Sequence, residues 1–132
     1  MKPIYITTAI DYVNGTPHIG HAVEKVQADA LARFYKAQGR EVYFVTGTDE
    51  HGQKIFEKSQ EQGRDVKEMV DEYAKAFQKM DEVLSVEFDD FIRTTDQEKH
   101  WPSVQKMWGK LVEAGDLKLD KYKGLYLSLI HI

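Results

Sequence analysis

The chain has 132 residues, the length of one domain, and it is 42% hydrophobic and 30% charged, which suits a soluble protein with a core. A net charge of −4, a pI near 5.7 and the lack of a basic stripe give no sign of nucleic-acid binding by charge alone, although a separate domain could still bind RNA. There is no cysteine and no signal-peptide core, and the longest strongly apolar run is residues 42–45. We therefore expect a cytoplasmic protein with no membrane or DNA partner.

Strand and helix patterns alternate along the chain. β-branched and aromatic residues predict strands over 4–9, 41–46 and 88–93, and an extended segment over 118–126. Apolar spacing predicts helices over 19–38, 53–62, 65–84 and 101–114, the first with its apolar residues on one side and the third capped by Asp65. Residues 95–98 have the form of a capping box for the last helix, and Pro102 places its start near Trp101.

This order of elements predicts an α/β fold with a parallel, doubly wound sheet of the Rossmann-like kind. Such sheets bind ligands at the carboxyl ends of their strands. Two polar loops, over residues 11–17 and 46–52, lie at that end. We expect the functional residues there.

The first loop places two imidazoles at a helix N-terminus. His18 and His21 share one face of the first helical turn, and Gly20 lets a ligand approach the backbone. Unpaired N–H groups and the helix dipole attract anions there, so we interpret the loop as a site for ATP phosphates. Two ordinary histidines capping a helix are the alternative, and the position after a strand and an Asn-Gly turn favours the phosphate site.

The second loop carries Asp49, directly after the predicted second strand. Its carboxylate could take a ribose hydroxyl, take an ammonium group, or cap the loop, and spacing alone does not decide among these. Glu50 and His51 resemble metal ligands, but His18, His21, Asp49 and His51 match no known zinc spacing, so no metal site is predicted.

Residues 9–21, which contain His-Ile-Gly-His, resemble the HIGH-motif region of class I aminoacyl-tRNA synthetases. With residues 46–54 included, the chain resembles the methionine-specific family among them. The leucyl, isoleucyl and valyl enzymes usually show a Trp-Asp pair in the second loop, and this chain does not. Residues 90–95 and 122–126 also resemble that family, and the likeness covers about residues 2–126.

The resemblance implies an enzyme that activates L-methionine with ATP, as its Mg2+ complex, to methionyl-adenylate and then charges tRNA(Met). The two histidines would be catalytic, stabilising the charge on the phosphates during adenylation, and Gly20 would lie against the adenine. The positions that the resemblance assigns to ligands are His18, Gly20 and His21 for ATP, and Ile10, Tyr12 and Asp49 for methionine, with Asp49 on the ammonium group.

The chain departs from the family after Tyr126, where the family continues with a cysteine that opens a zinc knuckle and this chain has Leu127. We expect residues 1–126 to be the N-terminal part of a catalytic domain, hence the first half of the sheet. We expect residues 127–132 to be a sequencing or cloning artefact. Zinc ligands of a full-length parent would then lie outside this chain, and the chain alone would be inactive. The alternatives are a small nucleotidylyltransferase with a related His-x-Gly-His loop, and a non-catalytic ATP-binding module.

Overall fold

A four-stranded parallel sheet is built around its central strand β3 (Val42–Asp49) in the computed structural model, which describes residues 2–121. β1 (Ile4–Thr7) pairs with the first half of β3 and β2 (Asp11–Tyr12) with its end, whereas β4 (Asp90–Arg93) pairs with residues 45–48. Because β4 occupies one side of β3, β1 and β2 lie in line on the other. The order β4, β3, β1 confirms the expected first part of a doubly wound sheet.

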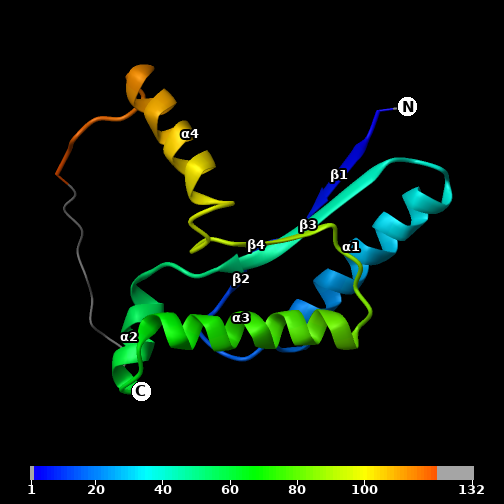
Figure 1. Ribbon diagram of the computed structural model, residues 1–132, viewed down its shortest axis with the longest axis horizontal. Helices are drawn as coiled ribbons and strands as arrows, with labels where there is room; N and C mark the ends of the chain where they lie inside the picture. The colour runs from blue at the N-terminus through cyan, green and yellow to red at the C-terminus, as the bar shows by residue number, and fades with distance from the viewer. Residues whose placement is uncertain (1, 122–132) are drawn as a thin grey trace.

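Within residues 2–121, four helices accompany the sheet: α1 (Ile19–Ala37), α2 (Gln53–Glu61), α3 (Val66–Val83) and α4 (Trp101–Glu113). α1 contacts β1, β3 and α3, and α2 contacts α3. Figure 1 shows α3 running beside the sheet on the side where α1 lies, while α4 extends away from it. No residue of α4 is buried.

The core consists of two apolar clusters. One joins the sheet to α1 and the segment before β4, and the other joins the start of the first loop to α2 and α3. The buried members are Ile6, Ala32, Phe44 and Val86 in the first cluster, and Val13, Ile55, Met69, Val70, Tyr73 and Phe77 in the second. The second cluster confirms the predicted apolar stripe of α3 from Val66 to Met80, but Val83, which the prediction also placed in the stripe, is 72% exposed. Asp65 is the N-cap, as predicted, and accepts a hydrogen bond from the Glu68 N–H at 3.0 Å. The second cluster thus holds the first loop against α2 and α3.

Helix α1 buries a different face from the one that the spacing of its apolar residues predicts. Its buried residues are Lys25, Asp29 and Ala32. Val23 and Phe34 remain 50% and 54% exposed. Asp29 can be buried because its carboxylate accepts hydrogen bonds from the Glu87 N–H and from Arg33.

Two local predictions differ from the structure. The predicted loop over residues 11–17 begins with the short strand β2, and β3 continues to Asp49, because Asp11 and Tyr12 pair with Thr48 and Asp49. The capping box over residues 95–98 is wrong: the Thr95 hydroxyl donates to Glu50, and Asp96 accepts the N–H groups of residues 98 and 99. α4 does begin at Trp101 with proline in its first turn.

The predicted extended segment 118–126 has no regular structure over 118–121. Its remainder and the tail 127–132 lie outside the described residues.

Gly47 marks the closest approach of β3 and β4. A Cβ at this position would lie 2.0 Å from the Ile92 carbonyl oxygen, so the backbone of one strand would have to move. We expect Gly47→Ala to lower the free energy of unfolding of the chain by about 1–3 kcal/mol or more, measured by urea unfolding. Gly109→Ala in α4 is the matched control, because a Cβ there meets nothing within 4 Å and alanine favours helix; an equal loss in both variants would contradict the argument.

Candidate active site

The N-terminus of α1 is closed by a capping box made of two histidines. His18 is the N-cap, with extended backbone angles, and its Nδ1 accepts the Gly20 N–H at 3.1 Å. His21 Nδ1 accepts the His18 N–H at 3.1 Å. Serine or threonine followed by glutamate usually makes this reciprocal pair. The two imidazoles stack with their ring centroids 3.7 Å apart.

This arrangement decides which nitrogen of each imidazole carries the proton. Because both Nδ1 atoms accept backbone N–H groups, each neutral ring carries its hydrogen on Nε2. Desolvation lowers the pKa of His21 below 6.5, although the Asp11 carboxylate opposes this. The His21 and Phe77 rings form a T-shaped pair, with centroids 5.0 Å apart. The capping box therefore leaves an Nε2–H donor on each ring for an external acceptor.

Gly20 has a role in this pair that the sequence did not reveal. A Cβ at position 20 would lie 2.9 Å from Cε1 and 3.0 Å from Nδ1 of His18. A side chain would push the imidazole away from the backbone N–H that it accepts. The glycine thus keeps the capping geometry intact.

The residues predicted to bind methionine lie on or beside β2. Tyr12 pairs with Asp49 of β3, and Ile10, one residue before the strand, is 45% exposed. A cleft of about 530 Å³ is lined by Tyr12 together with Gln53, Lys54 and Glu57 of α2. The structure therefore brings Tyr12 and Asp49 together on neighbouring strands. Asp11, between Ile10 and Tyr12, opposes the lowering of the His21 pKa through its negative charge.

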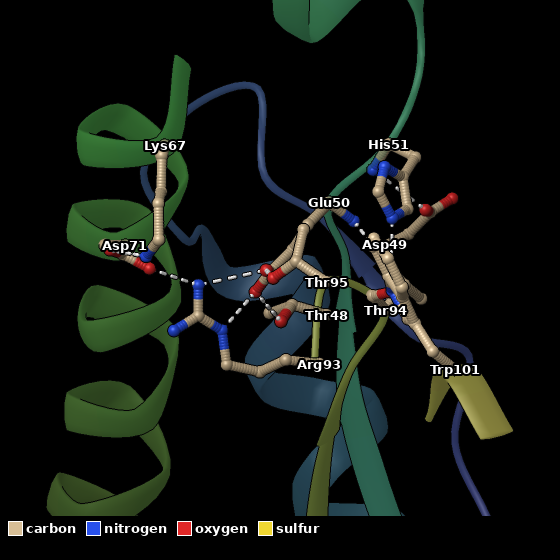
Figure 2. A network of polar contacts seen from close by, with 10 residues as sticks. All are labelled: Thr48, Asp49, Glu50, His51, Lys67, Asp71, Arg93, Thr94, Thr95 and Trp101. Carbon is tan, nitrogen blue, oxygen red and sulfur yellow. Dashed lines mark hydrogen bonds and ion pairs between the residues drawn. The ribbon is translucent and has the colours of Figure 1, made fainter. Parts of the chain in front are cut away.

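Asp49 is the last residue of β3, and its carboxylate has few hydrogen-bond partners among the described residues. Among the described residues its one hydrogen bond comes from the His51 N–H, at 3.5 Å, and it forms no ion pair. The side chain is half-buried. Figure 2 shows Asp49 beside a dense polar network in which its carboxylate takes almost no part. It is therefore available to an incoming cation.

The backbone on both sides of Asp49 is fixed by Thr94, directly after β4. Its N–H donates to the Thr48 carbonyl at 3.2 Å, and its hydroxyl accepts the Glu50 N–H at 2.8 Å. Its carbonyl accepts Trp101 Nε1–H at 3.1 Å and lies 3.1 Å from His51 Nε2. These contacts restrict the position of the loop that carries Asp49.

Glu50, the neighbour of Asp49, is buried and saturated with hydrogen bonds. Its Oε1 accepts the Thr48 hydroxyl at 2.7 Å and Arg93 Nε at 2.6 Å, and its Oε2 accepts Arg93 Nη2 at 2.9 Å and the Thr95 hydroxyl. Arg93 also donates to Asp71 of α3 at 2.6 Å (Figure 2). Sequence reasoning missed this network, because its members are far apart in the chain.

Asp81 of α3 is buried without a partner among residues 2–121: it is 1% exposed, and neither carboxylate oxygen has a hydrogen bond to them. Desolvation raises the pKa of Asp81 to about 6, although Lys25 opposes the change. A raised carboxyl pKa means that stability is highest when the group is protonated and falls as pH rises from 3.8 to about 6. We expect Asp81→Asn to stabilise the chain by about 2–3 kcal/mol at pH 8 and by little at pH 4, measured by urea unfolding at both pH values. An equal effect at both would contradict it.

No group of three metal-ligating side chains lies together within residues 2–121. Across the same residues, no helix is long and apolar enough to cross a membrane.

Comparison with known proteins decides the family. The model of the family described as tRNA synthetases class I (M) matches residues 4–130. The chain belongs to this family. It is 51% identical to the methionine-tRNA ligase of Rhizobium meliloti (strain 1021) over 125 residues, which cover 95% of this chain and 24% of the relative. It is 48% identical to the Listeria monocytogenes enzyme of that name, over 92% of this chain and 18% of the relative.

The solved structure of Mycobacterium tuberculosis methionyl-tRNA synthetase in complex with methionyl-adenylate matches with a TM-score of 0.84 and 43% identity, over 87% of this chain and 22% of that chain. The family resemblance and the Rossmann-like fold class are thus confirmed. The chain spans about a quarter of the length of the Rhizobium relative. The matched region runs to residue 130, and the nature of residues 127–132 stays a prediction, as do the roles of the individual site residues.

Proposed function

We propose that this chain is part of a methionine-tRNA ligase that joins L-methionine to ATP as methionyl-adenylate and then transfers the methionyl group to tRNA(Met). The observation that carries the proposal is the close match to a structure solved with methionyl-adenylate. The geometry of the two loops supports it. The work of such a ligase in protein synthesis would be in the cytoplasm.

The ATP part of the site is the N-terminus of α1. The Nε2–H groups of His18 and His21 donate to phosphate oxygens, and their hydrogen bonds strengthen as negative charge builds up on the α-phosphate in the transition state. The helix N-terminus adds partial positive charge. ATP enters as its Mg2+ complex, and Gly20 presents bare backbone beside the adenine.

The methionine part of the site lies on β2 and at the end of β3. Ile10 and Tyr12 line the pocket for the thioether side chain. The Asp49 carboxylate, which has one long hydrogen bond, takes the ammonium group by charge-assisted hydrogen bonds.

Adenylation then needs no protein nucleophile. A carboxylate oxygen of methionine attacks the α-phosphorus of ATP, the bond to the bridging oxygen breaks, and pyrophosphate leaves with the electron pair. The protein contributes positioning and electrostatic stabilisation. A hydroxyl at the 3′ end of tRNA(Met) afterwards takes the methionyl group and releases AMP. Any zinc site belongs to other parts of the whole protein.

Methionine-dependent exchange of pyrophosphate into ATP, measured on the full-length gene product, tests this function. We expect exchange with methionine and none with leucine or without an amino acid. Residues 1–132 alone are expected to show none. Exchange with another acceptor would favour a nucleotidylyltransferase, and ATP binding that is indifferent to methionine, measured by calorimetry, would favour a non-catalytic module; either result overturns the proposal.

Asp49→Asn tests the ammonium contact. The amide keeps the shape of the side chain and removes its charge, so a charge-assisted bond is lost. We expect the KM for methionine to rise about 10- to 100-fold, with little change in the KM for ATP, in the exchange assay. Asp116→Asn, at an exposed turn after α4, is the matched control. An unchanged KM for methionine in Asp49→Asn would assign this carboxylate to another role.

A further inference from the structure

Lys25 is a lysine with no exposed side-chain surface, which is rare because removing an ammonium from water is costly unless partners replace the water. It lies on α1, one helical turn after His21. Neither adenylation nor the ATP contacts of the capping box use it. Its burial therefore needs a separate explanation.

The ammonium of Lys25 is surrounded by oxygen atoms from two other segments. Nζ lies 2.8 Å from the Asp11 carboxylate and donates to the Thr8 hydroxyl at 3.0 Å and, more weakly, to the Ala9 carbonyl at 3.4 Å. It also donates to the Thr46 hydroxyl of β3 at 2.5 Å. One side chain of α1 thus contacts both the connection between β1 and β2 and the central strand.

These segments carry the residues of the proposed site. Ile10 lies between Ala9 and Asp11, which both contact Lys25, and Tyr12 directly follows Asp11. Thr46, which also contacts Lys25, lies on the strand that ends at Asp49. Resting on the proposed function, we propose that Lys25 is a positioning residue: it holds the methionine-binding segment, residues 8–12, against the helix that binds ATP. It contacts neither substrate.

Residues 11 and 12 of the segment pair with β3, but residues 8–10 have few other restraints. Residues 8–10 belong to neither strand, and their ties elsewhere are the Thr8 N–H to the Val45 carbonyl at 3.4 Å, the contact between the Thr8 and Thr46 hydroxyls, and the Ala9 N–H to the Glu24 carboxylate at 2.8 Å. The capping box, in contrast, closes entirely within residues 18–21. Loss of the ammonium should therefore displace the methionine pocket and leave the ATP contacts nearly unchanged.

Two buried carboxylates face this cation, Asp11 from β2 and the unpaired Asp81 from α3. Removing the positive charge leaves both without compensation. A neutral side chain at position 25 can therefore lower activity because the protein no longer folds, as well as because the methionine pocket is displaced. The experiment has to separate the two.

The test measures pyrophosphate exchange by the full-length gene product carrying Lys25→Met. We expect the KM for methionine to rise so that kcat/KM for methionine falls about 100-fold, because a displacement of about 1 Å can have that effect, while the KM for ATP stays within about 3-fold of the wild type. Lys36→Met, the same change at a half-exposed position of the same helix, is the matched control and should behave as the wild type. Lys25→Arg keeps the charge and should recover part of the methionine effect.

A triple variant, Lys25→Met with Asp11→Asn and Asp81→Asn, removes both uncompensated charges and restores folding if Lys25→Met unfolds. The positioning role predicts that the methionine defect persists in it. An unchanged KM for methionine in either variant, or equal rises for methionine and ATP, overturns the proposal. A wild-type protein whose exchange ignores methionine overturns the proposed function itself, and that result is visible before any variant is made.

Discussion

Replacing His18 by Asn or His21 by Asn in the full-length gene product is expected to lower the kcat of methionine-dependent exchange by about 10²- to 10³-fold. These two replacements keep an acceptor close to the position of Nδ1, because the amide oxygen of asparagine is bonded to Cγ as Nδ1 is in histidine, and asparagine is a good N-cap. They remove the distal Nε2–H donors. The capping contacts are thus kept while the proposed phosphate contacts are lost.

Two measurements make this prediction specific. Circular dichroism and urea unfolding should show little change, whereas alanine at position 18 should also cost the chain about 0.5–2 kcal/mol through loss of the cap. A pair of variants with full activity, or one that loses activity only because it unfolds, would show that the histidines serve only as caps.

The pH dependence follows from the same geometry. The pKa of His21 lies below 6.5 in the folded chain, so folding is favoured by the neutral ring. The contribution of the neutral His21 ring to stability is therefore fully present above pH 6.5 and is lost as pH falls from there through the lowered pKa. Protonation at Nδ1 also removes the acceptor for the His18 N–H, so exchange activity should fall over the same acidic interval.

The sequence predicts those parts of the fold that depend on neighbours along the chain. The stripe of α3, from Val66 to Phe77, repeats every three or four residues, so its buried face can be derived from spacing alone, and Asp65 is a preferred N-cap. The start of α4 at Trp101 follows from the restricted backbone of Pro102. Local chemistry is sufficient in these cases.

The missed features depend on residues that are distant in sequence. A two-residue strand such as β2 has no periodicity, and Asp11 is a residue type depleted in strands; its burial depends on Lys25 of α1. Glu50 is indistinguishable in sequence from a solvated loop residue until Arg93 is placed against it. The expected anion site at the α1 N-terminus was derived from position, but the stacking of His18 on His21 was not, since histidine is not a usual capping residue.

The second large effect concerns Arg93. We expect Arg93→Met to lower the free energy of unfolding of the chain by about 3–5 kcal/mol, measured by urea unfolding, because it leaves a buried charge without its partner. Arg93 gives two of the hydrogen bonds that hold the Glu50 carboxylate, whose side chain has no exposed surface. The hydrogen bonds that Arg93 donates to Glu50, and then the one that it donates to Asp71, raise the pKa of Arg93, so the guanidinium is charged at every pH of interest.

Lys67→Met is the matched control, because Lys67 also donates to Asp71 but is 81% exposed. Exposed ion pairs contribute little, so this control should change stability by less than about 1 kcal/mol. Adding Glu50→Gln to Arg93→Met removes the uncompensated charge and should recover part of the loss. If the double variant is as unstable as the sum of the single changes, the effect of Arg93 comes from packing and not from the buried charge. Recovery would mean that the conformation of the loop carrying Asp49 is held by a charge pair that joins the ends of β3 and β4 to α3.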